Sequence, residues 1–530
     1  PYHWRPLPSG PSPAVSSLTT KTAIVSGNTL LSRLLGFVRD LVIARLFGAD
    51  AATDAFFVAF KIPNLLRRLF AEGAFSMAFV PVLSEYKERA GPHALRHFID
   101  HIAGTLGAAL LLATLLGVLA APLLILLFAP GFAFDDSQRD MTVTMLRWTF
   151  PYLLFISLTA FAGGILNTFD RFGVPAFTPV LLNLSLMGCA IYLAPRLADP
   201  IMALAIGVFI AGLAQLAFQL PFLYRLGLLP RPRVDLQDAG VRRVARLMAP
   251  TLFGASIAQL SLLINTLLAS FLTAGSISWL YYSDRLMEFP LGILAAALGT
   301  VILPRLSRCH TSDDRDAFAN TLDWALRWIL LLGAPAAVGL LALAGPLMAT
   351  LFHSGEFGAE DVVMASHSLM AYALGLVALM CTKILAPAYY SRQDMRTPVR
   401  IGILSLAAGL VANLVLMVPL GHTGLALGTT IGATVNAGLL LRGLMRQQVL
   451  RPSTERTRLV IKCLLATALM GGLLHLGSGE VTDWIALGTA TRVLHLLGWI
   501  LLGGAVYIGV LLAWGVRPGQ LQALDRPHRA

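Results

Sequence analysis

The chain has 530 residues, of which 56% are hydrophobic and only 13% are charged, whereas an average soluble domain is about 25% charged. With a mean hydropathy of +0.73 and apolar runs of about 18 residues or more spread from end to end, this composition excludes most soluble enzyme folds. The formal net charge of +12 would indicate nucleic-acid binding in a soluble protein. Here the positive charge lies in loops between apolar runs, as the positive-inside rule requires, so we expect no nucleic-acid partner.

The sequence shows no pattern typical of a metal or catalytic site. Its four cysteines lie far apart, without a CxxC motif, and we expect free thiols in apolar surroundings. His93, His97 and His101 have helical spacing but lie near a basic loop, where solvation explains them. Residues 1–20 are polar and rich in Pro and Ser, and we expect a disordered or non-native tail and no cleavable signal.

The apolar runs predict an all-α polytopic membrane protein with about fourteen transmembrane helices, since a crossing needs about 20 helical residues. The predicted spans are 22–47, 54–83, 97–129, 141–167, 175–194, 201–224, 244–271, 277–304, 318–350, 361–389, 399–418, 423–445, 459–476 and 491–515.

The orientation follows from the distribution of Lys and Arg among alternate loops. One set of loops is basic and the other is nearly free of Lys and Arg, carrying acidic residues such as Glu356 and Glu360. The basic set, with both termini, is therefore expected on the cytoplasmic side. The basic loop residues are Lys87, Arg89, Arg96, Arg171, Arg225, Arg231, Arg233, Arg242, Arg243, Arg305, Arg308, Arg315, Arg392, Arg396, Arg446, Arg451, Arg456 and Arg458.

The chain also contains a weak internal repeat. Pro81 and Pro304 each lie at the end of a predicted span and are 223 residues apart, and so are Pro175 and Pro398 at the starts of two others. A shared offset favours two six-helix, pseudo-symmetric lobes in parallel orientation, a transporter architecture with its substrate site between the halves. The predicted divisions are an N-lobe at 21–225, a C-lobe at 226–446, two further spans within 447–516 and a cytoplasmic tail at 517–530.

Ionisable residues are concentrated in three of the spans. Each costs about 2.5–3.5 kcal/mol at the centre of a membrane helix, so each needs water, a partner or a function. Five of the six cations are arginines, whose planar guanidinium binds phosphate in a bidentate manner. The charged residues are Arg33, Arg39 and Asp40 in the first span, Asp54, Lys61, Arg67, Arg68 and Glu72 in the second, and Asp284, Arg285 and Glu288 in the eighth.

Helical geometry gives an expectation for each group. At 100° per residue, Arg33 and Asp40 lie within about 20° of each other, while Arg39 lies about 120° away. On the second span Asp54, Lys61, Arg68 and Glu72 form one polar stripe that should face water. The alternative is that the charges pair and only tie helices together. Arg33 with Asp40 and Arg285 with Glu288 are the pairs that the alternative predicts.

Three segments carry a resemblance to a known family: Ser32–Asp40, Ala52–Phe75 and Tyr281–Pro290. Together they resemble the MurJ (MviN) family of lipid II flippases, part of the multidrug/oligosaccharidyl-lipid/polysaccharide flippase superfamily. The likeness covers about residues 18–515.

The resemblance implies fourteen helices in two lobes, with spans 1, 2, 7 and 8 lining a central cationic cavity and spans 13 and 14 forming a groove for the lipid tail. It implies that Arg33, Arg39, Arg67 and Arg285 bind the pyrophosphate and that Asp40, Asp284 and Glu288 act as pairing or gating partners. Asp54 near the periplasmic end, with Lys61, Arg68 and Glu72, completes the polar lining. Some members hold sodium through acidic ligands among spans 7, 11 and 12. The corresponding polar residues here, Asn265, Asn413 and Thr430, are neutral, so no metal is expected.

The expected function is therefore transport and not catalysis: lipid II would move by alternating access from the cytoplasmic to the periplasmic leaflet of the bacterial inner membrane, for cell-wall synthesis. No cofactor is expected, and the energy source stays open between membrane potential, protons and other ions, as does binding of cell-wall synthesis proteins.

Three alternatives remain at this point. An ion-coupled exporter of drugs or of other polyprenyl-linked oligosaccharides would share the superfamily fold, but a cavity for cationic drugs favours acidic and aromatic residues over arginines. A membrane-embedded transferase would need a catalytic His or carboxylate beside a donor-binding loop. A scaffolding protein would not need charges inside its spans.

Overall fold

The computed structural model describes residues 15–69, 75–312, 314–450 and 454–516, and leaves the side chains of 15–22, 249–262, 293–301 and 455 undescribed. Glu72, most of the predicted N-terminal tail and the tail at 517–530 lie outside the described residues.

The described chain is helical, with one isolated β-bridge between Ser354 and Phe357. The helices are α1 (Val15–Phe47), α2 (Ala51–Arg67), α3 (Ser76–Glu85), α4 (Gly91–Leu119), α5 (Ala121–Phe128), α6 (Asp136–Thr149), α7 (Tyr152–Thr168), α8 (Gly173–Gly188), α9 (Met202–Arg225), α10 (Ala239–Ala269), α11 (Ser276–Thr311), α12 (Arg315–Ala342), α13 (Ala344–Leu351), α14 (Ala359–Ala373), α15 (Leu376–Tyr390), α16 (Arg396–Arg446), α17 (Thr454–Gly477), α18 (Val481–Ala486) and α19 (Thr489–Ala513).

Every predicted span overlaps one or more of these helices, which confirms the all-α class. The first helix begins at Val15 and so takes in the last part of the predicted tail. Helix α16 covers two predicted spans and is kinked between them, at the non-helical residue Gly421 (φ 54°, ψ −131°) shortly after Pro419. A positive φ suits glycine, and a proline removes one helical hydrogen bond, so the chain bends where the sequence predicts a break.

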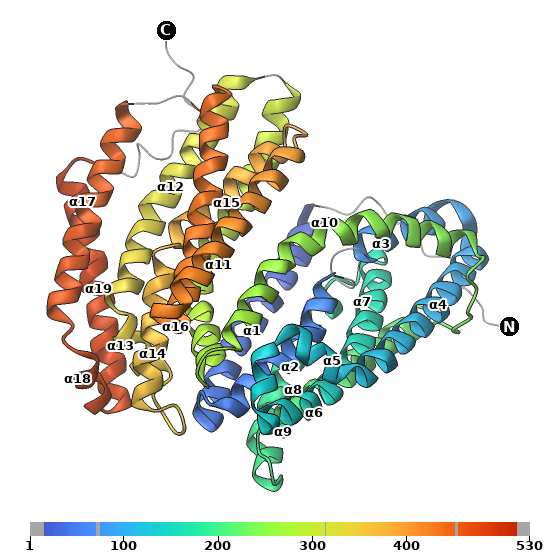
Figure 1. Ribbon diagram of the computed structural model, residues 1–530. Helices are drawn as coiled ribbons and strands as arrows, with labels where there is room; N and C mark the ends of the chain where they lie inside the picture. Colours follow the sequence, from blue (N-terminus) through green and yellow to red (C-terminus); the bar gives the residue numbers. More distant parts are fainter. Residues whose placement is uncertain (1–14, 70–74, 313, 451–453, 517–530) are drawn as a thin grey trace. The chain divides into compact units, whose positions relative to one another are not determined.

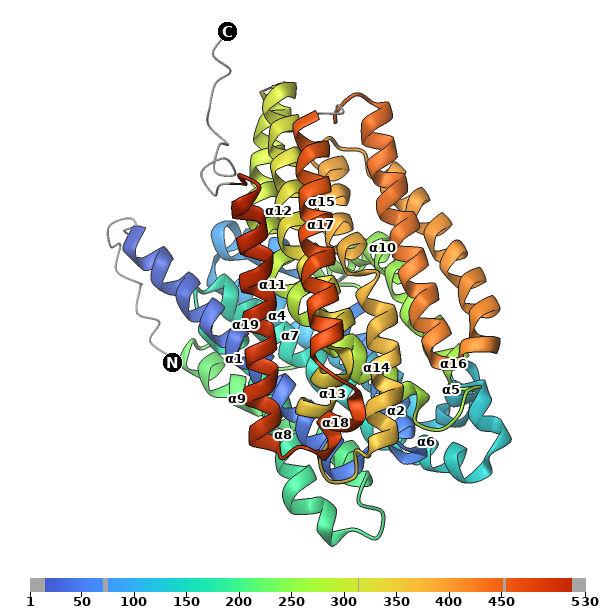
Figure 2. The same cartoon turned by 90° about the vertical axis from the view of Figure 1, so that its left-hand side faces the viewer.

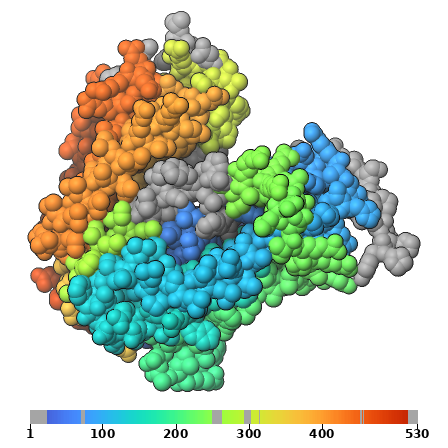
Figure 3. Space-filling view, turned by 45° about the vertical axis from the view of Figure 1, so that its right-hand side comes forward, coloured from blue at the N-terminus to red at the C-terminus, as the bar shows by residue number. Residues whose placement is uncertain are grey.

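Among the described residues, eight helices are long and apolar enough to cross a membrane, or nine if α14 and α15, bent by 41°, form one span. The predicted total of about fourteen crossings therefore remains a prediction. The surface of α16, orange in Figure 3, carries exposed apolar side chains such as Ile403, Val411, Val415 and Val418. Such a face suits contact with lipid chains.

The chain packs as two compact units. Unit 1 comprises Pro1–Val42, Ala59–Leu124 and Thr142–Ala258, and unit 2 comprises Ile43–Val58, Ile125–Met141 and Gln259–Ala530. The predicted lobes at 21–225 and 226–446 have other borders and remain a prediction about the two halves of the transporter.

The core of unit 1 is aromatic. Within it, α4 and α7 run side by side (Figure 1). Phe79 of α3 packs against Phe98 of α4 and Phe161 of α7, with ring centroids 5.9 and 5.1 Å away. All three rings are almost fully buried. This packing holds the cytoplasmic ends that the sequence predicts for these helices.

In unit 2 the last two long helices pack beside each other, and α17 also lies against α12 (Figure 2). The Tyr507 hydroxyl of α19 donates to the carbonyl of Leu331 on α12 at 2.8 Å. The buried Arg492 guanidinium donates to four backbone carbonyls, including those of Ala349 and His353. Because the guanidinium satisfies these backbone oxygens, it fixes the N-terminal turn of α19 against α13.

Candidate functional site

A pocket with one exposed arginine lies in unit 1. It has a volume of 370 Å³ and is bounded by α1, α7 and the start of α8, with Thr29, Ser32, Arg33 and Asn167 as its polar lining. Arg33 is exposed and makes no ion pair or hydrogen bond with another residue that the structure describes. The Thr29 hydroxyl already donates to the Val25 carbonyl at 2.8 Å. The pocket thus combines an available guanidinium with the Ser32 hydroxyl and the Asn167 amide, donors that suit an oxyanion.

The next charged residues of α1 after Arg33 are Arg39 and Asp40, about two helical turns further along. Both are buried and bonded to each other. The Arg39 guanidinium meets the Asp40 carboxylate at 2.6 and 3.0 Å, and their side chains are 6% and 0% exposed. The alternative pairing of Arg33 with Asp40 is therefore wrong. Helical angles give only the direction in which a side chain leaves the helix. The Arg39 side chain is long enough to bend around the helix and bond to the carboxylate of the adjacent Asp40.

Asn183 of α8 completes this group, and sequence reasoning missed it. Its Oδ1 accepts a hydrogen bond from Arg39 Nη1 at 3.1 Å, and its Nδ2 donates to the carbonyl of Ser32 at 3.0 Å. One amide thus joins α8 to α1 both at the buried ion pair and beside the pocket. The available signal was a polar side chain within an apolar run, which needs a partner in a membrane helix.

The remaining cations of the second span lie in unit 1. Arg67 Nε donates to Asn64 Oδ1 at 2.9 Å, Lys61 is partly buried and Arg68 is exposed. Two members of the predicted polar stripe are therefore accessible to solvent to some degree. Glu72 lies outside the described residues.

Asp54, at the start of the same stripe, behaves differently. It is 2% exposed. Its Oδ2 accepts from the Gly275 amide at 2.8 Å, and its Oδ1 accepts from the amide and hydroxyl of Ser278 at 2.8 and 2.6 Å. The prediction that the stripe faces water is thus wrong at Asp54. The carboxylate instead caps the N-terminus of α11, where free amides and the helix dipole favour a negative charge.

Further contacts within unit 2 surround this cap, and we call the group the Asp54 junction: residues 43–58 and 125–141 together with 270–278 and 352–358. The Glu356 amide donates to the Arg45 carbonyl at 3.0 Å, and the Gly131 amide donates to Ser270 Oγ at 3.0 Å. Gly48 has φ +66°, and a Cβ there would lie 2.6 Å from the Glu356 carbonyl oxygen. The chain passes so closely at this point that only glycine fits.

The junction has a clear place in the predicted topology. Its first two segments belong to the predicted N-lobe, and its last two belong to the predicted C-lobe. All four contain or adjoin loops that the charge distribution assigns to the periplasmic side. The two predicted lobes are therefore bonded to each other at that end.

The third charged group lies on α11 in unit 2. Arg285 Nη1 and Glu288 Oε2 are 3.0 Å apart, with side chains 33% and 50% exposed, and Asp284 in the same turn is partly buried. The predicted pairing of Arg285 with Glu288 is confirmed. The structure thus joins Arg39 with Asp40 in unit 1 and Arg285 with Glu288 in unit 2.

The neutral residues considered for an ion site bond to one another. Asn413 Nδ2 donates to Asn265 Oδ1 at 2.8 Å, and Asn265 Nδ2 donates to Thr429 Oγ1 at 2.9 Å. Thr430 bonds separately, to the Ala371 carbonyl at 2.8 Å. These amides and hydroxyls tie the end of α10 to α16.

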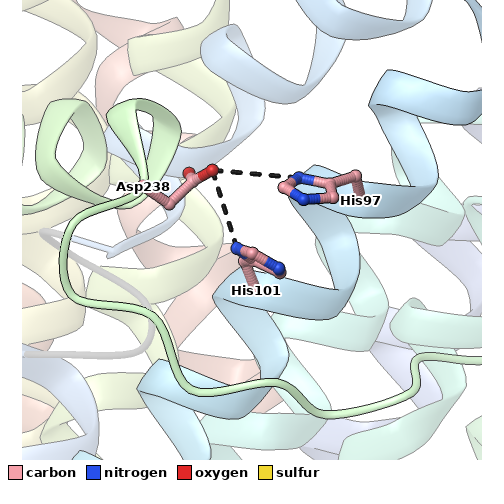
Figure 4. A group of neighbouring side chains, drawn as sticks. All are labelled: His97, His101 and Asp238. Carbon is pink, nitrogen blue, oxygen red and sulfur yellow. Dashed lines mark ion pairs between the residues drawn. The ribbon is translucent and has the colours of Figure 1, made fainter.

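The helical histidines need one correction. His97 is exposed, but His101 is only 7% exposed and lies against Asp238 of the loop between α9 and α10 (Figure 4). Solvation therefore explains His97 but not His101, because the loop covers the second imidazole.

Comparison of the sequence with protein-family models and with curated proteins identifies the same family in both cases. A family model described as "Lipid II flippase MurJ" matches residues 43–495. The chain is 47% identical to a probable lipid II flippase MurJ of Vibrio cholerae over 507 residues, which is 94% of this chain and 97% of the relative. It is 45% identical to the lipid II flippase MurJ of Burkholderia cenocepacia over 455 residues, covering 85% and 88% of the two chains.

Solved structures show the same architecture. A lipid II flippase MurJ in an inward closed conformation matches with a TM-score of 0.75 at 24% identity, over 92% of this chain and all of that one (100%). An inward-facing multidrug transporter of the MATE family matches with a TM-score of 0.64 at 12% identity, over 81% and 98%. At these identities the likeness is one of fold.

Proposed function

The chain belongs to the lipid II flippase MurJ family, and from that membership we propose that it carries lipid II from the cytoplasmic to the periplasmic leaflet of the bacterial inner membrane. The family consists of transporters of the multidrug/oligosaccharidyl-lipid/polysaccharide fold. The observation that carries the proposal is the 47% identity over nearly the whole length of both this chain and its relative.

The Arg33 pocket supports the proposal chemically. Lipid II joins its polyprenyl tail to its disaccharide-pentapeptide through a pyrophosphate, and that anionic group faces the greatest barrier in the bilayer core. A volume of 370 Å³ lies at the lower end of the range for ligand pockets. It accommodates a diphosphate but not the whole head group. Arg33 then supplies a bidentate guanidinium, while the fixed Arg39–Asp40 pair holds α1 in place.

Arg285 has a different role in this proposal. It is already paired with Glu288 at 3.0 Å, so a phosphate oxygen replaces the carboxylate when substrate arrives. Because the pair is partly exposed, the exchange requires little desolvation. Arg67, with Asn64 as its neighbour, is assigned to the cationic lining within unit 1.

The Asp54 junction supports capture from the cytoplasmic side. Alternating access requires one end of the path to be closed while the other receives substrate. The hydrogen bonds of Asp54 and of Glu356 lie at the end that the charge pattern assigns to the periplasm, and we assign closure of that end to them. Release then requires these bonds to break.

We assign the lipid tail to the apolar surface of α17 and α19, where Leu465, Leu469, Leu497 and Leu501 are exposed.

We assign the energy of the return step to the membrane potential. With both termini on the cytoplasmic side, inward movement of the arginines after substrate release is favoured by about 2.3 kcal/mol per charge per 100 mV of inside-negative potential.

The test measures how much lipid II becomes accessible at the periplasmic face of cells that depend on this chain. At matched expression, Arg285→Ala and Arg33→Ala are expected to lower accessibility by about tenfold or more, since a hydrogen bond to a charged group contributes about 1.5–3 kcal/mol. Arg45→Ala is the control, because Arg45 is an exposed arginine of the same helix outside the pocket and its bond in the Asp54 junction is made by the backbone carbonyl, which the substitution keeps.

Two results contradict the proposal in different ways. If depletion of the protein leaves lipid II accessibility unchanged, the substrate assignment fails. If depletion abolishes it but Arg33→Ala behaves as Arg45→Ala does, the substrate stands and the pocket assignment fails.

A further inference from the structure

Two histidines and an aspartate converge at the cytoplasmic end predicted for unit 1. His97 and His101 lie four residues apart on α4, so both rings emerge from one face of the helix, with centroids 3.9 Å apart. Asp238 precedes α10 and faces both rings (Figure 4). One ligand atom from each residue lies within 4.8 Å of the others.

The polar atoms face one another at ion-pair distance, marked by the dashed lines in Figure 4, but they form no hydrogen bonds. Asp238 Oδ2 lies 3.8 Å from His97 Nδ1 and 3.6 Å from His101 Nδ1. Asp235 Oδ2 lies 3.7 Å from the same nitrogen of His101. These separations are too long for hydrogen bonds. His101 is 7% exposed, and its Nδ1 has no hydrogen-bond partner, although a buried polar atom normally has one.

The carboxylates are held by their other oxygens. Asp238 Oδ1 accepts from the Val241 amide at 3.0 Å and thereby caps α10, and Asp235 Oδ1 accepts from the Gln237 amide at 2.7 Å. In each case the second oxygen is left facing the imidazoles. Carboxylates oriented in this way resemble the preorganised shells of metal sites, in which ligand direction is fixed by hydrogen bonds elsewhere.

The loop that carries the aspartates is fixed to α4. The Arg233 amide donates to the Asp100 carbonyl at 3.0 Å, and the Arg231 amide donates to Asp100 Oδ1 at 2.7 Å. A Cβ at Gly104 would meet the Arg233 backbone at 2.3 Å, so the loop lies directly on the helix. The three ligand residues are thus positioned by backbone contacts on both sides.

We propose that His97, His101 and Asp238 form a binding site for a divalent transition metal of the zinc class. Imidazole nitrogen with carboxylate oxygen is a ligand set that zinc accepts, whereas calcium and magnesium require oxygen ligands. The exposed side of His97 gives the ion access, and the fourth position is open to water, with Asp235 beside it. The bound ion fastens the loop between α9 and α10 to α4.

The distances agree with this assignment. Ligand atoms about 2.0–2.2 Å from a tetrahedral zinc ion lie about 3.3–3.6 Å from each other. The separations of 3.6 and 3.8 Å from Asp238 to the two imidazoles therefore need only a small contraction. An i, i+4 pair of histidines on one helical face is a spacing that zinc sites use.

The test uses the full-length protein in detergent, stripped of metal and of any affinity tag, with Zn²⁺ alone as the probe. Competition against a chromophoric chelator should give one tight site per chain. His97→Ala and Asp238→Asn are each expected to weaken Zn²⁺ binding at least about tenfold. Asn keeps an oxygen for the α10 cap. His93→Ala is the matched control, because it removes an exposed histidine one turn earlier on the same helix.

A second readout guards against misfolding. Zn²⁺ should raise the unfolding midpoint of the parent and of His93→Ala but not of His97→Ala, since a ligand stabilises only the state that binds it. His97 is the deciding position because its side chain is 56% exposed, so its loss leaves packing intact. The proposal is overturned if the parent binds no Zn²⁺ stoichiometrically, or if His97→Ala binds as His93→Ala does.

Discussion

Asp40 and Asp54 are both buried carboxylates on the first two helices, but they are satisfied in opposite ways. Asp40 is paired with the adjacent Arg39, in a group closed by Asn183 within unit 1. Asp54 makes no ion pair with a residue that the structure describes, and it accepts instead from amides and a hydroxyl that lie 221 and 224 residues further along the chain. The first arrangement joins α1 to α8 within unit 1. The second joins two segments that would separate under the proposed alternating access.

The largest effect is expected from Asp40→Ala. The substitution removes the carboxylate that pairs with Arg39, which is 5% exposed, and breaking a buried ion pair by removing one partner costs about 3–5 kcal/mol. Thermal unfolding in detergent should show a large loss of stability. Arg33→Ala, at an exposed position of the same helix, serves as the control. A variant as stable as the parent would show that the pair is not structural.

A smaller effect, of a different kind, is expected from Asp54→Ala. The fold should remain, but the closed junction loses hydrogen bonds to a charged group, an amount of about 1–3 kcal/mol that shifts opening by about 5–150-fold. A cysteine replacing Ser276, which is fully buried beside the junction, should then react correspondingly faster with a membrane-impermeant maleimide in a background without other cysteines.

Glu360→Ala is the control for that experiment, because it removes an exposed carboxylate from the same unit. Equal labelling rates in Asp54→Ala and Glu360→Ala would mean that the junction does not depend on Asp54.

Ser278→Ala sharpens the comparison at the same site. It removes the hydroxyl that donates to Asp54 Oδ1 at 2.6 Å but keeps the Ser278 amide. One hydrogen bond contributes about 1 kcal/mol, so labelling should accelerate about fivefold. An acceleration as large as that of Asp54→Ala would show that the hydroxyl, and not the helix cap, closes the junction.

The smallest effect is expected from Glu288→Gln. Its pair with Arg285 is partly exposed on both sides, and such pairs contribute less than about 1 kcal/mol. The unfolding midpoint should stay close to that of the parent, and lipid II should remain accessible. A loss of stability as large as that of Asp40→Ala would contradict the distinction between buried and exposed pairs.

The partners of Asp40, Asp54 and Glu288 show how much of the structure the sequence can predict. Hydropathy located the helices because the bilayer imposes length and composition on each of them. The Arg285–Glu288 pair was predictable because residues three apart on a helix are neighbours. Asn183 and Ser278 were not assigned as partners of Arg39 and Asp54, because each contact joins helices whose register depends on packing.

The burial of His101 was missed for a related reason. Its spacing places it beside a basic loop, and nothing in the spacing tells that residues 231–238 lie on top of the helix. The contact between this loop and α4 depends on Gly104, because only a residue without a Cβ lets the Arg233 backbone approach so closely. Packing of this kind is visible only once the chain is folded.

The cap on α11 has a consequence for biosynthesis. Asp54 leaves the ribosome 221 residues before Gly275, and at about 5–20 residues per second its partners follow about 11–44 seconds later. During that interval α2 holds a carboxylate with no helix end to bind, at a position that becomes fully enclosed in the finished protein. The hydrogen bonds that satisfy Asp54 therefore form only after the start of α11 has been made, so the first helices cannot complete this packing while they are being synthesised.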